Sequence, residues 1–300
     1  MITKPTVLIL GAGASMPFGF PSGLRLLQEI SAKLTTVGWY DHFVLLDFEQ
    51  KLVDEFQKAL FFSGKKSVDL FLEHRKEFID VGKAAIAMAL FPYEVEARLF
   101  ERDSKHRNWY TYLYDKMDAP FEQFDQNKLS VITFNYDRSF EQFLFKAAVH
   151  SFGKPTAETI AKLNSFPIVH VHGKLGELQW QAGSREEFKD YNGDFSRRDI
   201  RQAVKKIKII SDNIEEDSEF KQAHELLRNA GRIYFLGFGY NNVNLSWLRV
   251  SECSDIWIPG TAYGLGKAEK KTIMNVWSNV KLQDSKLDVL DFFTEIARLD

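Results

Sequence analysis

The sequence predicts an α/β protein: a doubly wound parallel sheet with an all-helical insert. Three observations support this class. The chain of 300 residues opens with a short apolar run, residues 7–10, that leads directly into a glycine-rich turn. Further apolar runs recur after residue 125, separated by segments whose apolar residues have helical spacing. Residues 38–124, between these two parts, show only helical patterns.

The first apolar run has the composition of a buried parallel strand, because Val7-Leu8-Ile9-Leu10 has no polar residue on either face. Glycines in the turn that follows let the backbone bend sharply and approach a ligand, and the next residues begin a helix whose free N–H groups attract phosphate. The residues that we expect to bind a dinucleotide pyrophosphate are Gly11, Ala12, Gly13 and Ser15.

The turn departs from the usual dinucleotide fingerprint, so a tight turn without a ligand is the alternative interpretation. Met16 occupies the place of the third glycine or alanine, and no acidic residue follows at a distance of about 20 residues. A loop with two prolines, residues 17–23, comes next. It cannot continue a helix smoothly, so we expect it to cover the ligand, with Phe20 and Pro21 in contact with it.

A helix is predicted from Leu24 to about Val37, which completes the first half of a βαβ unit. Residues 38–124 are predicted to form a helical insert subdomain. Residues 1–37 and 125–300 then make up a Rossmann-like NAD-binding domain. Its later strands are expected at 129–134, 167–171, 232–236, 255–258 and 280–283, and its final helix at 287–299. The polar segment 177–229 is expected to contain at least two helices.

The composition narrows the classes of function. The chain has 39 basic and 41 acidic residues and a net charge of −2, so no overall field favours nucleic acid or an anionic membrane. Its one cysteine, Cys253, excludes an internal disulfide and a cysteine-based zinc site. Apolar runs stay well below the roughly 18 residues of a membrane span, and no leader segment is evident. We expect a cytoplasmic protein that needs no metal.

Glycine-rich or polar segments follow five of the predicted strands. Ligands of a doubly wound sheet bind beyond the carboxyl ends of its strands, so these segments are the expected binding site. A turn would explain any one of them alone, but five at corresponding places favour a shared site. The segments are residues 11–15, 135–137, 172–173, 237–242 and 260–262.

Four of these motifs, in their order and spacing, resemble the signature of the sirtuin (SIR2) superfamily. They are Gly11-Ala-Gly-Ala-Ser15, Thr133-Phe-Asn-Tyr-Asp137, Val171-His-Gly173 and Gly237-Phe-Gly239. The chain is most similar to bacterial SIR2-like NAD hydrolases that act as effectors of antiphage defence. The similarity covers roughly residues 5–35 and 125–300 and extends only loosely to the insert.

The resemblance implies a role for each matching residue. Asn135 corresponds to the catalytic asparagine, Asp137 to the acid near the nicotinamide amide, and His172 to the histidine beside the nicotinamide ribose. The residues at 11–15 correspond to the phosphate turn. Gly237 and Gly239 correspond to the second nucleotide loop. Asn241, which follows them, is a candidate ribose contact and is equally consistent with a turn former.

Two departures from the deacylating sirtuins disfavour protein deacylation. The cysteines of their zinc module are absent, and Phe238 replaces the small hydroxyl residue of their second nucleotide loop. The remaining residues suit hydrolysis of NAD⁺. Cleavage of its nicotinamide–ribose bond expels a neutral base from a cationic ring, so neither an acid nor a metal is needed, and the site has to orient the substrate, exclude bulk water and supply one water.

The same side chains also have structural interpretations. Asn135 and Asp137 are typical helix caps, and His172 before a glycine is typical of a turn. His170 is interpreted as a packing residue. The basic cluster at residues 197–208 is interpreted as a solvated face, with a grip on a partner or a phosphate as the alternative.

The sequence therefore predicts an NAD⁺ glycohydrolase that yields nicotinamide and ADP-ribose and serves as the effector of an antiphage, abortive-infection system. NAD⁺ is its substrate. We expect a homo-oligomer, controlled by a separate sensor or regulatory protein, without direct contact to nucleic acid or membrane. The alternatives are an NAD-dependent protein deacylase, a non-catalytic NAD- or ADP-ribose-binding regulatory subunit, and an oxidoreductase.

Overall fold

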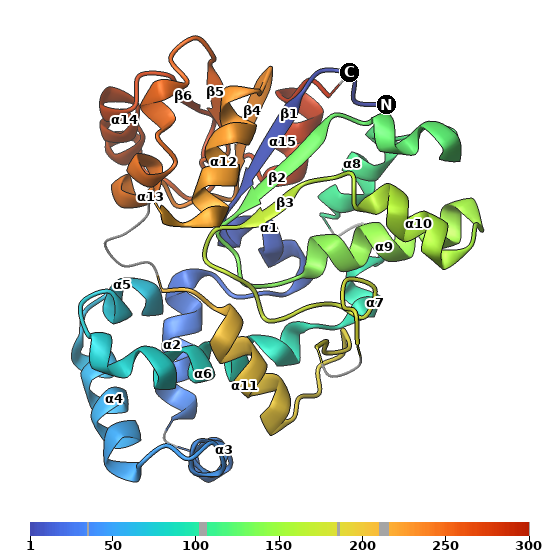
Figure 1. Cartoon of the computed structure of the whole chain (residues 1–300). Coiled ribbons are helices and arrows are strands. Elements are labelled where there is room, and N and C mark those ends of the chain that lie inside the picture. The colour runs from blue at the N-terminus through green and yellow to red at the C-terminus, as the bar shows by residue number, and fades with distance from the viewer. Residues whose placement is uncertain (35, 102–106, 185–186, 210–215, 300) are drawn as a thin grey trace.

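The computed structural model describes residues 1–34, 36–101, 107–184, 187–209 and 216–299. At its centre these residues form a six-stranded parallel sheet in the order β3-β2-β1-β4-β5-β6 (Figure 1). The strands are β1 (Thr6–Leu10), β2 (Leu129–Thr133), β3 (Ile168–His170), β4 (Arg232–Leu236), β5 (Ile258–Gly260) and β6 (Val280–Leu282).

The predicted doubly wound, Rossmann-like sheet is confirmed. From β1 the chain builds outward to β2 and β3 on one side, and β4, β5 and β6 follow on the other. β1 pairs along its full length with both β2 and β4. The strand order therefore reverses between β1 and β4, which opens a crevice at the carboxyl ends of these two strands.

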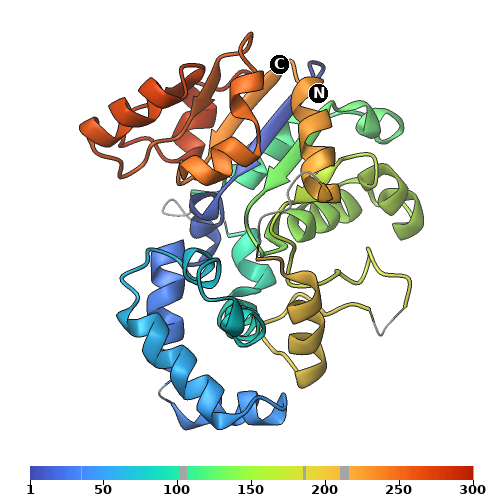
Figure 2. The same ribbon diagram turned by 60° about the vertical axis from the view of Figure 1, so that its left-hand side comes forward.

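Helices cover both faces of the sheet (Figures 1 and 2). The face that carries Val7 and Ile9 packs against α12 (Ser218–Arg228), α13 (Asn242–Trp247) and α14 (Lys267–Val276). Leu8 and Leu10 alternate with them and face the other side, as strand geometry requires. The helices on that side are α8 (Trp109–Lys116), α9 (Ser139–Phe152), α10 (Thr156–Leu163) and α15 (Val289–Glu295).

A layer of helices lies beyond the carboxyl ends of the strands, at the bottom of Figure 1. It contains α2 (Gly23–Lys33), α3 (Val37–Leu45), α4 (Gln50–Phe62), α5 (Val68–Leu72), α6 (Ile79–Leu90) and α11 (Arg197–Lys206). The described residues between β1 and β2 contain no strand. α6 lies at the centre of the layer and packs against α2, α4, α5 and α11, so its face is buried on several sides. We call these helices the helical layer.

The helical layer does not coincide with residues 38–124. α2 precedes that range, and α11 joins it from the segment between β3 and β4. α8, within that range, packs against α9 and α15 beside the sheet. The two short helices α1 (Ala12–Ser15) and α7 (Glu96–Leu99) connect the layer to the sheet. Helices α11 and α12 fulfil the expectation of at least two helices in residues 177–229.

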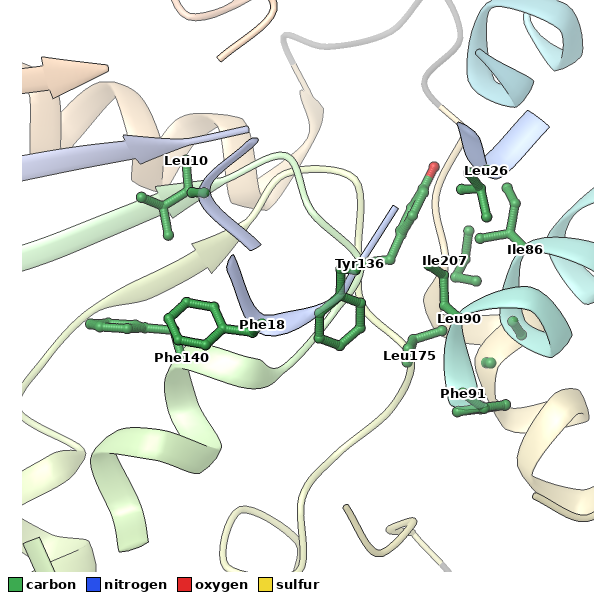
Figure 3. Close-up of a cluster of buried hydrophobic side chains, with 14 of the residues drawn as sticks. Leu10, Phe18, Leu26, Ile86, Leu90, Phe91, Tyr136, Phe140, Leu175 and Ile207 are labelled. Carbon is green, nitrogen blue, oxygen red and sulfur yellow. The ribbon is translucent and has the colours of Figure 1, made fainter. Parts of the chain in front are cut away.

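One hydrophobic cluster joins the sheet to the helical layer (Figure 3). Phe18 and Phe140 lie at its sheet side, next to Leu10. Tyr136 follows in the middle, and beyond it Leu90 of α6 and Ile207, just after α11, continue the cluster into the helices. The two parts of the molecule therefore share a single core.

The fifth strand begins later than the sequence pattern predicts. Residues 255–258 have an apolar pattern, but the strand runs from Ile258 to Gly260. The N–H of Ile256 donates to the carbonyl of Cys253 at 3.1 Å and closes a turn, which keeps the preceding residues out of the sheet. Gly260 then pairs with Phe235 of β4. None of the helices in the described residues is both long enough and apolar enough to cross a membrane.

Candidate functional site

A cavity of about 510 Å³ lies at the crevice between β1 and β4. Its walls are the glycine turns after β1 and β4, the loop after β5, the start of α2 and the start of α15. The lining residues are Ala12, Gly13, Met16, Pro17, Ser22, Gly23, Arg107, Gly237, Phe238, Gly239, Thr261, Ala262, Tyr263, Leu265, Asp288 and Val289. Its position is the one at which doubly wound sheets bind nucleotides.

The glycines of the two turns allow the backbones after β1 and β4 to touch. Gly13 N–H donates to the carbonyl of Gly237 at 2.9 Å. A Cβ on Gly13 would lie 2.8 Å from the Gly237 Cα, and a Cβ on Gly237, whose φ is +58°, would lie 2.0 Å from the Ala14 nitrogen. Neither contact is tolerable, so these glycines are required by the fold itself, with or without a ligand.

Backbone pairing also limits which amides of the first turn can meet a phosphate. The N–H groups of Gly11 and Gly13 donate to Leu236 and Gly237, and that of Ala14 donates to the Gly11 carbonyl. The Ala12 N–H has no hydrogen-bond partner in the described part of the chain. It is thus the amide of this turn that remains open to a ligand.

Thr261 fastens the turn after β4 to the loop after β5. Its hydroxyl accepts from Gly237 N–H at 2.7 Å, and its carbonyl accepts from the Tyr240 hydroxyl at 2.8 Å. The Tyr240 ring packs over Gly260, where a Cβ would lie 2.1 Å from the tyrosine oxygen. Tyr240 itself adopts a φ of +49°, an uncommon conformation for an aromatic residue. This wall of the cavity is consequently fixed by contacts at both ends.

Ser15 brings the two side chains predicted to do the chemistry into one network. The amide nitrogen of Asn135 donates to the Ser15 hydroxyl at 3.0 Å and to the Gly11 carbonyl at 2.9 Å. The Ser15 hydroxyl donates to Asp137 at 2.7 Å. Ser15 is buried and outside the cavity lining. Its hydrogen bonds therefore hold Asn135 and Asp137 rather than project toward a phosphate.

Asp137 is buried and accepts several hydrogen bonds. Besides Ser15, it accepts from the backbone N–H of Ser139 at 3.1 Å and from the Ser139 hydroxyl, which also contacts the Tyr110 hydroxyl at 2.7 Å. Burial raises the pKa of Asp137, and the hydrogen bonds from Ser139 and Ser15 oppose this. Asp137 precedes the N-cap residue Arg138 and accepts from the first amide of α9, so the helix-cap interpretation is met only in part. The Asn135 side chain instead reaches back to the turn after β1.

His172 lies in an aromatic environment at the end of β3. It is 8% exposed, and its ring packs edge-on against Phe134, with 5.1 Å between the ring centres. Tyr136 lies on another side, at 6.2 Å. Burial lowers the pKa of His172, and the nearby carboxylates of Asp69 and Asp217 offset this in part. Nε2 has no hydrogen-bond partner within the described residues, so the neutral ring keeps one nitrogen for a ligand.

An aromatic pair separates His172 from the cavity. Phe134 contacts both His172 and Phe238, with ring centres 5.1 and 5.0 Å apart. Phe238 belongs to the cavity lining, whereas His172, Asn135 and Asp137 do not. The structure thus gathers the three side chains at the carboxyl ends of β2 and β3, beside the cavity but outside its open volume.

His170 has a polar role that the sequence did not reveal. One ring nitrogen contacts Glu141 on α9 at 2.7 Å, and the other contacts the carbonyl of Asn135 at 3.0 Å. Burial alone would raise the pKa of Glu141, but His170 lowers it below its usual value. Histidine and glutamate are 29 positions apart, so no local pattern indicates the pair. His170 fixes the backbone that carries the Asn135 side chain, and its interpretation as a packing residue is incomplete.

A fully buried ion cluster lies directly after Asp137. Arg138 makes two hydrogen bonds to Glu94, at 2.6 and 2.8 Å, and neither side chain is exposed. Arg138 also donates to the carbonyls of Glu177 and Lys189, and the Lys189 ammonium contacts Glu94 at 3.1 Å. The cluster ties the loop after β2 to the segment before α7 and to residues 177–189.

Five of the residues predicted to bind the cofactor lie outside the cavity lining: Gly11, Ser15, Phe20, Pro21 and Asn241. Phe20 is buried in the core, with its ring 6.0 Å from that of Tyr93, and Pro21 is buried beside it. Their loop reaches the cavity through its ends, residues 16–17 and 22–23. The Asn241 side chain accepts from Val243 N–H at 2.9 Å and caps α13, as the turn-forming interpretation predicts. Gly237 and Gly239 do line the cavity.

Sequence reasoning missed five cavity residues: Arg107, Tyr263, Leu265, Asp288 and Val289. Arg107 and Asp288 form an ion pair although they are 181 positions apart, so no spacing signal was available.

The basic cluster of α11 has ion-pair partners within the chain: Arg201 pairs with Asp47, and Lys206 with Glu177. Within the described residues, no group of three or more His, Cys, Asp or Glu side chains is placed to hold a metal ion.

No model of a known protein family matches the chain, and no curated protein matches its sequence. The geometry at the carboxyl end of the sheet is therefore the main basis for a function.

Proposed function

We propose that the protein binds NAD⁺ in the cavity between β1 and β4 and hydrolyses its nicotinamide–ribose bond. One observation carries the proposal: a cavity large enough for a nucleotide is walled by Gly13 and Gly237, and Ser15 connects the same turn to Asn135 and Asp137. Binding and chemistry would then use the two sides of a single glycine turn. The resemblance of the strand-end motifs to SIR2-like NAD hydrolases supports the same reaction.

Asn135 is oriented for the reaction by its neighbours. Both hydrogen bonds that its amide nitrogen can donate go to Gly11 and Ser15. The amide oxygen has no partner in the described residues, so it is the atom left to accept from a ribose hydroxyl or from the attacking water. An acceptor beside the anomeric carbon stabilises the positive charge that develops there as nicotinamide leaves.

His172 and Asp137 supply the other two functions. The unpartnered Nε2 of neutral His172 accepts a proton from the ribose or from water. Asp137 accepts a hydrogen bond from the nicotinamide carboxamide and holds the ring in place. For this the aromatic pair Phe134 and Phe238 has to admit the nicotinamide end, while the adenosine end stays in the cavity.

The products of this reaction are nicotinamide and ADP-ribose, and no metal takes part. We extend the proposal to an effector of antiphage defence that assembles into a homo-oligomer and is controlled by a separate sensor protein. This extension is supported by the sequence resemblance alone.

A non-catalytic NAD- or ADP-ribose-binding subunit is the second candidate. It is favoured by one observation: Asn135, Asp137 and His172 do not line the cavity. In this case the polar network would only support the glycine turn, and the bound nucleotide would leave unchanged.

Chromatography of NAD⁺ incubated with the protein tests the proposal, with purified protein and with cells under phage challenge. The wild type should release nicotinamide. Asn135→Ala and His172→Ala should lower the rate by about 10²- to 10⁴-fold, the range for loss of a positioned catalytic group. The matched controls Asn164→Ala and His74→Ala, at exposed positions, should retain the wild-type rate.

Each other outcome has a definite meaning. Full activity in both variants would show that the site is assigned to the wrong residues. Binding of NAD⁺ without turnover, in cells as well as in solution, would favour the regulatory subunit. Release of nicotinamide only in the presence of an acetylated lysine peptide would indicate a deacylase.

A further inference from the structure

Arg107 and Asp288 line the cavity together with the two glycine turns. The Arg107 guanidinium donates to the two carboxylate oxygens of Asp288 at 2.6 and 3.1 Å, and it also contacts Asp291. Among the described residues that line the cavity, Arg107 is the one cation and Asp288 the one anion. Every other wall is apolar, glycine or hydroxyl. These two side chains therefore supply the charges of the described cavity lining.

The pair can open without leaving a buried charge. The side chains of Arg107, Asp288 and Asp291 are 43%, 28% and 32% exposed. Asp288 also has a second role: it caps α15 by accepting from the N–H of Asp291 at 2.9 Å. Both carboxylates thus keep water or backbone partners when the guanidinium moves away. Exposed ion pairs of this kind contribute little net stability.

A diphosphate can replace the two carboxylates as the partner of the guanidinium. The planar guanidinium donates a pair of parallel hydrogen bonds, and a phosphate accepts them in the same geometry as a carboxylate. A nucleotide diphosphate placed against Gly13 and Gly237 would bring its negative charges into a cavity that offers no other cation among the described lining residues.

We propose that Arg107 is the phosphate-binding group of this cavity, and that its ion pair with Asp288 and Asp291 is a resting state that the diphosphate of a bound nucleotide displaces. This inference rests on the proposed nucleotide site but not on catalysis. Asp288 then acts as an internal competitor: it holds Arg107 in the empty cavity and reduces the affinity for diphosphate ligands. Ligands without phosphate do not require the exchange.

Calorimetric titration with ADP-ribose and with adenosine tests this exchange. Arg107→Ala should weaken ADP-ribose binding by about 10- to 100-fold, the range for a lost hydrogen bond to a charged group, and leave adenosine binding unchanged. Asp288→Asn should strengthen ADP-ribose binding several-fold, because asparagine caps α15 equally well and no longer holds the guanidinium as a counter-ion. Arg75→Ala removes an exposed pair with Glu77 and serves as the control.

The opposite signs separate the proposal from a purely structural role. If the pair only supports α15 and the segment before α8, both variants should weaken the binding of both ligands, and the proposal is overturned. It is also overturned if the wild type does not bind ADP-ribose. NAD⁺ cleavage is measured separately. If the two variants shift the ADP-ribose affinity in opposite directions but NAD⁺ is not cleaved, the ion-pair exchange is supported and the proposed hydrolase activity is rejected. If NAD⁺ is cleaved but neither variant changes the affinity, the hydrolase activity is supported and the exchange is rejected.

Discussion

The two halves of the sheet hold their carboxyl-terminal loops in different ways. On the side of β2 and β3, buried polar and charged side chains do so: the network of Ser15 with Asn135 and Asp137, and the ion cluster around Arg138. On the side of β4 and β5, two closely packed glycines do so: Gly237 meets the backbone of the first turn, and Gly260 meets the Tyr240 ring. Directed hydrogen bonds fix the orientation of side chains, whereas closely packed glycines leave the space in front of them open, as the cavity shows.

The largest loss of stability is expected from breaking the buried ion cluster on the side of β2 and β3. Glu94→Gln removes the one carboxylate that the structure places between the Arg138 and Lys189 side chains, and leaves two buried cations without it. Removing one partner of a buried ion pair costs about 3–5 kcal/mol. Urea denaturation should show this loss. Glu77→Gln breaks an exposed pair of similar length, 2.6 Å to Arg75, and should have no measurable effect. A comparable loss in both variants would contradict the role of burial.

On the side of β4 and β5, adding a single methyl group at a closely packed glycine should destabilise the protein. Gly237→Ala places a Cβ against the Ala14 nitrogen at a φ of +58° and should destabilise the protein by about 2–4 kcal/mol. Gly264→Ala is the matched control, since its φ of +77° imposes the conformational strain while the space around it is open. It should cost about 1–2 kcal/mol. Equal denaturation midpoints for the two variants would refute the close approach of the two turns.

The smallest effect is a pH dependence of stability. Because burial lowers the pKa of His172 below its usual value of 6.5, the unfolded chain takes up a proton that the folded chain refuses. The contribution of His172 to stability is then fully present above pH 6.5 and falls as the pH drops below it, by less than about 1.4 kcal/mol per pH unit, the limit for one proton. His172→Phe should flatten this decline in urea titrations between pH 8 and pH 5. An unchanged decline would place the responsible group elsewhere.

Local patterns predicted much of this architecture. The run 7–10 and its glycine turn appear as β1 and α1, and the strand at 232–236 matches β4 residue for residue. These elements are encoded by neighbouring residues: apolar runs without polar interruption form buried strands, and glycines mark where backbones meet. The gathering of Asn135, Asp137 and His172 at one edge follows from strand polarity, so it too was predictable.

Contacts between residues far apart in the chain could not be predicted from the sequence. Glu94 and Arg138 are 44 positions apart, and Arg107 and Asp288 are 181 apart. These separations are far longer than the three or four positions over which helical spacing brings side chains together, so no local pattern marks these pairs. The strand order was equally hidden, because it depends on which crossover passes which face. Phe20 was assigned to the ligand from its place in a loop, whereas its apolar ring is more stable in the core.

The shared core in Figure 3 has a consequence for how the molecule responds to disturbance. Tyr136 stands between Asn135 and Asp137 in the chain, yet its ring is embedded among side chains of both the sheet and the helical layer, and its hydroxyl donates to Asp69 on α5. Tyr136 therefore connects α5 directly to the segment that carries Asn135 and Asp137. A protein that docks on α5 and shifts it would move the neighbours of Asn135 and Asp137 without contacting either residue.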